Sequence, residues 1–209
     1  MDARSYDDWY KTSRGRWIGR TEYRLLRNAL GARPGTTLLD VGCGTGFFTR
    51  LFAEDGFETV GIDPDPGYLT LAKSRQKNQG MYLQGDVRSL PFRNRSFDFA
   101  VAVTSLCFVS EMSLALSEMA RVTRNRFALG LLNRQSLLFR EKWEKGGYKG
   151  ARWDTAGEVR TMISDLATGI DVKSAIFFPS GTFVSRTLER VIPPNLLYGG
   201  FLVISARPK

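Results

Sequence analysis

The sequence predicts an α/β fold, an open and mostly parallel sheet with helices on both faces. Short apolar runs alternate with stretches of helical periodicity along most of the chain. Several of the runs end in a carboxylate, and the carboxyl ends of strands are where ligands bind in open α/β sheets. With 209 residues and 43% hydrophobic content, the chain is expected to form a single domain.

Periodicity and turn residues locate the expected elements in order. The amino-terminal segment is expected to form one helix over about 5–31, ended by Gly31. Further helices are expected at 47–54, 67–76, 111–123 and, from the capping-box spacing of Thr155 and Glu158, 155–166. Strands are expected at 38–41, 60–63, 81–86, 96–103, 127–132, 171–178 and 201–206.

The turn after the first expected strand is rich in glycine. Gly42, Gly44 and Gly46 alternate with other residues, and Phe47 stands where the dinucleotide pattern G-x-G-x-x-G requires glycine. Glycine permits positive φ and lets the main chain approach a ligand closely. With Asp40 two residues ahead, the run resembles the D/E-x-G-x-G-x-G loop of class I S-adenosylmethionine (SAM) dependent methyltransferases.

Carboxylates after the next strands extend the resemblance. It implies that Asp63 accepts the ribose hydroxyls, that Asp86 and Val87 contact the adenine, and that the loop at Thr104 faces the methionine end. The cofactor-binding residues that it implies are Asp40, Gly42, Cys43, Gly44, Asp63, Pro64, Asp86, Val87 and Thr104. Taken singly, each carboxylate could equally stabilise a turn, and Cys43 could be a small packed residue.

The resemblance covers the chain from about residue 37 to the end. It implies a Rossmann-like, seven-stranded, mostly parallel sheet with an antiparallel last strand. We expect an amino-terminal helical cap at 1–36, a SAM-binding core at 37–132 and a substrate-side half at 133–209. The family's usual Pro-Gly-Gly before the fifth strand is replaced by Arg124-Asn125-Arg126, from which we expect a tighter turn.

Aromatic residues near the amino terminus mark a possible cover over the site. The run from Tyr6 to Tyr10, with Trp9, is similar to the start of small-molecule methyltransferases related to ubiquinone and menaquinone biosynthesis. Tyr6, Trp9, Tyr10 and Phe108 are therefore candidate substrate or lid residues. The alternative is that the aromatic residues anchor the first helix.

Charge leaves the acceptor class open. The formal net charge is +9, and Arg16, Arg20, Arg24 and Arg27 are spaced to share one helix face. Such a stripe could bind RNA phosphates, or it could be an ordinary solvated helix face. We prefer the solvated face because no aromatic residues interleave with the arginines.

Absent residue types narrow the chemistry. The chain has no histidine, which excludes a histidine general base, and its two cysteines suit neither a disulfide framework nor a metal site. The polar amino terminus predicts no signal peptide, and no apolar stretch is long enough for membrane insertion, so a cytoplasmic location is expected.

The function expected from these features is methyl transfer from SAM to a small-molecule acceptor by in-line displacement, with S-adenosylhomocysteine (SAH) as product. No catalytic residue or metal is assigned, and the protein is expected to be a monomer or homodimer. Two alternatives stay open: an RNA or protein methyltransferase that uses the basic surface, and a SAM-binding protein without turnover. Nucleic acid is a possible partner that the sequence does not favour.

Overall fold

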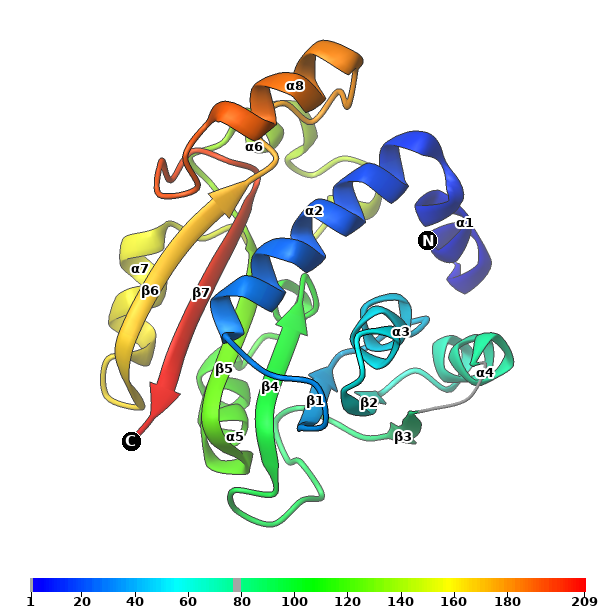
Figure 1. Cartoon of the computed structure of the whole chain (residues 1–209), viewed down its shortest axis with the longest axis vertical. Coiled ribbons are helices and arrows are strands. Elements are labelled where there is room, and N and C mark those ends of the chain that lie inside the picture. Colours follow the sequence, from blue (N-terminus) through cyan, green and yellow to red (C-terminus); the bar gives the residue numbers. More distant parts are fainter. Residues whose placement is uncertain (1, 77–79) are drawn as a thin grey trace.

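The computed structural model describes residues 2–76 and 80–209, and within these ranges the chain forms one seven-stranded sheet (Figure 1). The strand order is β3-β2-β1-β4-β5-β7-β6, and β7 pairs antiparallel with both β5 and β6. The expected mostly parallel sheet with an antiparallel last strand is confirmed. The strands are β1 (Thr37–Val41), β2 (Glu58–Asp63), β3 (Met81–Gln84), β4 (Phe97–Val103), β5 (Thr123–Leu132), β6 (Ala167–Ala175) and β7 (Phe201–Pro208).

Helices cover both faces of the sheet. One apolar cluster joins α5 and α7 to the sheet, and a second joins α2 and α3 to the opposite face. The α-helices are α1 (Ala3–Lys11), α2 (Ser13–Leu30), α3 (Phe47–Glu54), α4 (Pro66–Arg75), α5 (Met112–Val122), α6 (Leu137–Lys142), α7 (Ala156–Ile163) and α8 (Phe183–Val191), with short 3-10 turns η1 (Leu106–Phe108) and η2 (Gly146–Tyr148). No helix in the described ranges is both long and apolar enough to cross a membrane.

The amino-terminal segment forms two helices, so the expectation of one helix over 5–31 is wrong. Thr12 adopts an extended conformation, and its hydroxyl accepts a hydrogen bond from the Gly15 amide at 3.0 Å, which starts α2. A Cβ atom at Gly15 would lie 2.0 Å from the Trp9 carbonyl oxygen, so α2 can turn this closely against α1 only with glycine there. The break directs α1 back over the carboxyl ends of the strands (Figure 1).

Three elements in the second half also differ from expectation in their boundaries. Arg124-Asn125-Arg126 forms no turn but belongs to β5, which starts at Thr123 directly after α5 and shifts register against β4 between Phe97 and Phe99. The strand expected at 171–178 runs from Ala167 to Ala175. The capping box of Thr155 and Glu158 is present, although its helix ends at Ile163 rather than at 166.

Candidate functional site

The glycine loop after β1 forms one wall of a cavity at the carboxyl ends of β1, β2 and β4. Gly42, Gly44 and Gly46 all have positive φ, at 69°, 54° and 75°. A Cβ atom at Gly42 would lie 2.3 Å from Ser105, and one at Gly46 would lie 2.4 Å from the Tyr82 hydroxyl. At Gly44 the nearest atom would be 3.9 Å away. Gly44 therefore presents bare backbone to open space, as close approach of a ligand requires.

We call this space the loop cavity. Its volume is about 530 Å³, and its walls include the predicted site residues Gly42, Gly44, Asp63, Pro64, Asp86, Val87, Thr104 and Phe108, together with Tyr6 of α1. The structure thus brings together residues that lie far apart along the chain. Predicted residues outside this wall are Asp40, Cys43, Trp9 and Tyr10.

Asp63 is a carboxylate of the loop cavity that two backbone amides hold. Its Oδ2 accepts the Gly44 amide at 2.8 Å, and its Oδ1 accepts the Asp65 amide at 2.9 Å. Burial raises the pKa of the Asp63 carboxyl, and these two hydrogen bonds act against that rise. Each carboxylate oxygen has a second lone pair, so Asp63 can still accept hydroxyl donors from a ligand.

Asp86 is held by Arg88, a residue that the sequence did not single out. The Arg88 guanidinium donates to both carboxylate oxygens, at 3.0 Å and 2.6 Å, and its other nitrogen donates to Glu111 at 2.7 Å. Hydrogen bonds from Arg88 lower the pKa of the Asp86 carboxyl. The ion pair thereby ties the turn after β3 to the start of α5 along the rim of the loop cavity.

Asp40 and Cys43 lie beneath the glycine loop. The Asp40 carboxylate is 1% exposed and accepts the Thr49 hydroxyl at 2.6 Å, and burial raises its pKa to about 7. Cys43 packs against Leu69 and Tyr82, and burial raises the pKa of its thiol. Both positions support the loop from below, and a direct cofactor contact at either stays a prediction.

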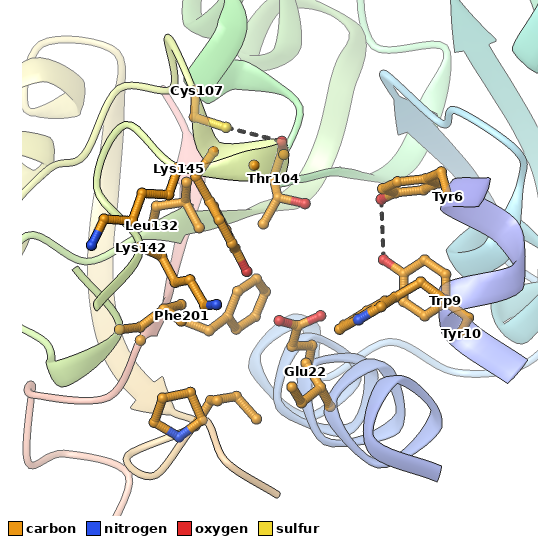
Figure 2. Close-up of a pocket in the computed structure, with 18 of the residues that line it drawn as sticks. Tyr6, Trp9, Tyr10, Glu22, Thr104, Cys107, Leu132, Lys142, Lys145 and Phe201 are labelled. Atoms are coloured by element: carbon orange, nitrogen blue, oxygen red, sulfur yellow. Dashed lines mark hydrogen bonds between the residues drawn. The ribbon is translucent and has the colours of Figure 1, made fainter. Parts of the chain in front are cut away.

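A second and larger cavity opens beside the first, and we call it the aromatic cavity. Its volume is about 780 Å³. Four residues line both cavities: Tyr6, Tyr68, Thr104 and Phe108. The wall of the aromatic cavity also contains Trp9, Tyr10, Glu22, Cys107, Leu132, Tyr148 and Phe201 (Figure 2).

Two β-branched residues beside the aromatic cavity have strained backbones. Thr104, directly after β4, has φ 50°, and Ile176, directly after β6, has φ 64°. Positive φ is rare in β-branched residues, and such strain is concentrated at functional sites. The Thr104 amide donates to the Gly130 carbonyl at 2.8 Å, which holds Thr104 at the boundary between the two cavities.

Glu22 of α2 is the one carboxylate among the described residues that line the aromatic cavity. Within residues 2–76 and 80–209 it makes no hydrogen bond and no ion pair. Burial is the sole cause that raises the pKa of its carboxyl, to about 8. In Figure 2 the carboxylate points into the cavity between Trp9 and Phe201, and Lys142 and Lys145 lie on the side away from Trp9.

The aromatic residues of α1 have two kinds of environment: one packs in the core and anchors the helix, and the others line the cavities. Tyr10 is buried and stacks on Phe47, with ring centroids 3.7 Å apart and planes 11° from parallel. Its hydroxyl lies 3.1 Å from that of Tyr6, which faces both cavities, whereas Trp9 faces the aromatic cavity. The geometry therefore accommodates both sequence interpretations, with Tyr10 as the anchor and Tyr6 and Trp9 as the cover.

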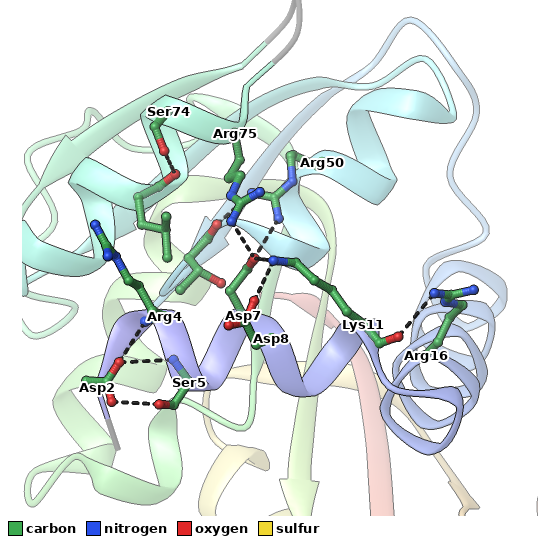
Figure 3. Close-up of polar contacts among 12 residues, drawn as sticks. Asp2, Arg4, Ser5, Asp7, Asp8, Lys11, Arg16, Arg50, Ser74 and Arg75 are labelled. Atoms are coloured by element: carbon green, nitrogen blue, oxygen red, sulfur yellow. Dashed lines mark hydrogen bonds and ion pairs between the residues drawn. The ribbon is translucent and has the colours of Figure 1, made fainter.

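A buried ion-pair cluster fixes α1 from its other side (Figure 3). Asp7 is 5% exposed and lies 3.4 Å from Arg50 of α3, 3.7 Å from Arg75 of α4 and 3.6 Å from Lys11. These pairs connect α1 to the two helices that follow β1 and β2. Helix α1 is thus fastened to the half of the molecule that carries the glycine loop.

Sequence reasoning missed Glu22, Arg88 and Tyr68. Glu22 falls within the arginine-rich helix, so from the sequence it looks like a surface carboxylate. It is enclosed because the chain breaks at Thr12 and α1 folds back beside it. The signal for Arg88 was its position two residues after Asp86, where a short-range ion pair is possible. Among the described residues, no group of three or more His, Cys, Asp or Glu side chains could hold a metal ion.

Comparisons with known proteins fit this geometry. Residues 39–127 match the family described as "Methyltransferase domain". A malonyl-[acyl-carrier protein] O-methyltransferase of Serratia marcescens is 38% identical over 44% of this chain and 36% of its own length. A demethylmenaquinone methyltransferase of Renibacterium salmoninarum is 39% identical over 48% of this chain and 42% of its own length. The alignments thus span less than half of the length of these two relatives.

Longer alignments reach the rest of the chain. An uncharacterized protein of Mycobacterium tuberculosis is 30% identical over 98% of this chain and 72% of its own length. The solved structure of a SAM-dependent methyltransferase, "possible histamine N-methyltransferase", from Thermotoga maritima has a TM-score of 0.78 and 25% identity over 99% and 95% of the two chains. The structure of the [4+2]-cyclase SpnF matches with a TM-score of 0.64 and 20% identity, over 88% of this chain and 79% of its own. This match shows a shared fold only.

The chain belongs to the SAM-dependent methyltransferases, and SAM is the methyl donor of that family.

Proposed function

We propose that this protein transfers a methyl group from SAM to a small molecule held in the aromatic cavity. The observation that carries the proposal is the meeting of two cavities along Tyr6, Tyr68, Thr104 and Phe108. One cavity has the bare backbone and carboxylates that suit a nucleoside, and the other has the largely apolar walls that suit an organic acceptor.

Residues of the loop cavity would hold the cofactor. Asp63 would accept the ribose hydroxyls, and Asp86 with the Val87 amide would contact the adenine. Gly44 would lie against the ligand, where its missing Cβ leaves room. SAM supplies a methyl group on a sulfonium, which is already a good leaving group. The chain's own task is therefore to hold the acceptor close, in line and dry.

The size of the aromatic cavity favours a small acceptor. Pockets of about 300–1,000 Å³ enclose drug-sized ligands, and this cavity of about 780 Å³ falls within that range. A macromolecule would have to insert a single side chain or a flipped base to reach Thr104. Trp9 and Tyr6 would close over a small acceptor and exclude water.

The test has a binding part and a turnover part. Calorimetry should detect SAH binding to the wild-type protein. Incubation with methyl-labelled SAM and a fractionated metabolite extract should move the label to a small compound. Label that appears only in RNA or protein would replace the small-molecule proposal, and SAH binding without any transfer would favour the non-catalytic alternative.

A further inference from the structure

Glu22 is the feature that the proposed function leaves unused. On the basis of that function, we propose that the acceptor is a small amine on an aromatic or aliphatic frame, and that Glu22 binds its nitrogen and takes up its proton.

The first observation is the position of the Glu22 carboxylate. It projects from the middle of α2 into the aromatic cavity, between Trp9 and Phe201 and across from Thr104 (Figure 2). In the described part of the chain no cation comes within ion-pair distance of it, although Lys142 and Lys145 line the same cavity. Buried or half-buried carboxylates are normally paired, so a group left unpaired here is available to a ligand.

The second observation is the chemistry of the surrounding wall. Burial raises the pKa of Glu22 to about 8, because nothing in the cavity compensates an ionised carboxylate. An ammonium group would provide that compensation, while a carboxylate ligand would not. The faces of Trp9 and Phe201 also attract a cation, which adds to the preference for an amine.

The third observation is that other candidate proton acceptors in the aromatic cavity are unsuitable. Burial raises the pKa of Tyr6, Tyr148 and Cys107 to about 12 and also raises the pKa of Tyr10 and Tyr68 above that of an ordinary tyrosine, so all five keep their protons at neutral pH. Lysine and arginine side chains are donors only. The titratable groups that line the cavity are Tyr6, Tyr10, Arg14, Glu22, Tyr68, Cys107, Lys142, Lys145, Tyr148 and Lys149. In a chain without histidine, Glu22 is left as the group able to accept a proton there.

Glu22 loses its own proton to solvent when the ammonium form of the acceptor binds. The ammonium form of the acceptor transfers one proton to the Glu22 carboxylate, which leaves a neutral amine and a neutral carboxylic acid. In an apolar cavity this neutral pair lies close in free energy to the hydrogen-bonded ion pair, so the neutral amine is accessible for methyl transfer. The amine lone pair then forms the N–CH₃ bond while the S–CH₃ bond breaks with its electron pair going to sulfur. The products are SAH and a methylated ammonium, Glu22 keeps its proton as the product leaves, and the one proton released per turnover is the one expelled when the ammonium ion binds.

The test uses matched probes on the SAH-saturated protein at pH 7. Calorimetry compares 2-phenylethylamine with 2-phenylethanol and 3-phenylpropionate, which share its ring. A charge-assisted hydrogen bond exceeds a neutral one, so we expect the amine to bind about tenfold more tightly than the alcohol, and the carboxylate to bind most weakly. E22Q should reduce amine binding to the level of the alcohol. E58Q, the same change on an exposed residue at the amino end of β2, should leave all three affinities unchanged.

Proton release provides a readout that a purely structural Glu22 would not affect. A carboxyl with a pKa of about 8 is mostly protonated at pH 7, so binding of an ammonium ion should expel close to one proton. Repeating the titration in two buffers of different ionisation enthalpy measures this number. The wild type and E58Q should release the proton, and E22Q should release none.

The outcomes separate this inference from the proposed function. If SAH binds but the amine has no advantage over the alcohol, or if E22Q keeps that advantage, Glu22 is not the amine site while the proposed function stands. Tightest binding of the phenylpropionate would assign the cavity to an anion held by the lysines and overturn the proposal. If SAH itself fails to bind, the proposed function fails first.

Discussion

The two cavities differ in how their carboxylates are satisfied. In the loop cavity, Asp63 accepts two backbone amides and Asp86 is clamped by Arg88. In the aromatic cavity, Glu22 has no partner in the described chain, and burial alone sets its pKa. The difference indicates that the loop cavity is organised before its ligand arrives, while the aromatic cavity holds a group that its ligand must complete.

The largest effect is expected from Gly42→Ala, compared with Gly44→Ala. Both changes place a side chain at positive φ, but only the Cβ at position 42 would overlap Ser105. Strain and overpacking together should reduce the free energy of unfolding of G42A by about 2–6 kcal/mol. G44A should lose about 1 kcal/mol of stability and most of its SAH affinity. Urea unfolding and calorimetry measure the two quantities, and equal stability of the two variants would contradict the assignment of Gly44 to open space.

Tyr10→Ala and Trp9→Ala should separate the anchor from the cover. Tyr10 is buried against Phe47, so its loss should reduce stability by about 3 kcal/mol even without ligand. Trp9 faces the aromatic cavity and not the loop cavity, so W9A should melt closer to the wild type, keep the melting-temperature rise that SAH induces, and bind 2-phenylethylamine more weakly in its SAH complex. Unchanged amine binding in W9A would refute closure by Trp9 over the acceptor.

Asp63→Ala should weaken SAH binding. Removing a charged acceptor of the ribose hydroxyls should cost about 1.5–3 kcal/mol of binding free energy. Asp171→Asn, a carboxylate change on β6 far from the loop cavity, serves as the control for charge and should bind SAH like the wild type. Unchanged affinity in D63A would remove this residue from the site.

Asp40→Asn should change how stability depends on pH. The folded-state pKa of Asp40, about 7, lies above its unfolded value, so the folded protein holds this proton more tightly. The stability associated with the proton is complete below about pH 4 and is lost as pH rises towards 7 and beyond. Because Asn does not titrate, D40N should be more stable relative to wild type at pH 8 than at pH 5, by on the order of 1–2 kcal/mol. A difference that does not vary with pH would contradict burial of a titrating Asp40.

The smallest effect is expected from reversing the basic stripe. Arg20 and Arg24 are exposed, whereas Arg27 already pairs with Asp55 and lies over the Phe57 ring. The double change Arg20→Glu, Arg24→Glu should shift stability by less than about 0.5 kcal/mol. It should also leave any weak tRNA binding and its salt dependence nearly unchanged. Tight, salt-steep binding that the double change abolishes would bring back the RNA alternative.

The residues of the loop cavity could be placed at one edge of the sheet from the sequence because they lie in consecutive short stretches. Each stretch follows the carboxyl end of a strand, and parallel strands bring their carboxyl ends to the same edge of the sheet. Gly44, Asp63 and Asp86 could therefore be placed together without knowing how the helices pack. The aromatic cavity is assembled from α1, α2, η1, η2 and β7, which the sequence does not link locally. Glu22 enters it only because the chain breaks at Thr12, and that break depends on a side-chain cap and a single close approach at Gly15.

If the two cavities hold cofactor and acceptor on either side of Thr104, a crystal structure of the SAH complex will show it. We expect the ribose of SAH on Asp63, its adenine beside Asp86 and Val87, and its sulfur at Thr104 facing the aromatic cavity. SAH bound elsewhere, or in the loop cavity with its sulfur directed away from the aromatic cavity, would contradict it.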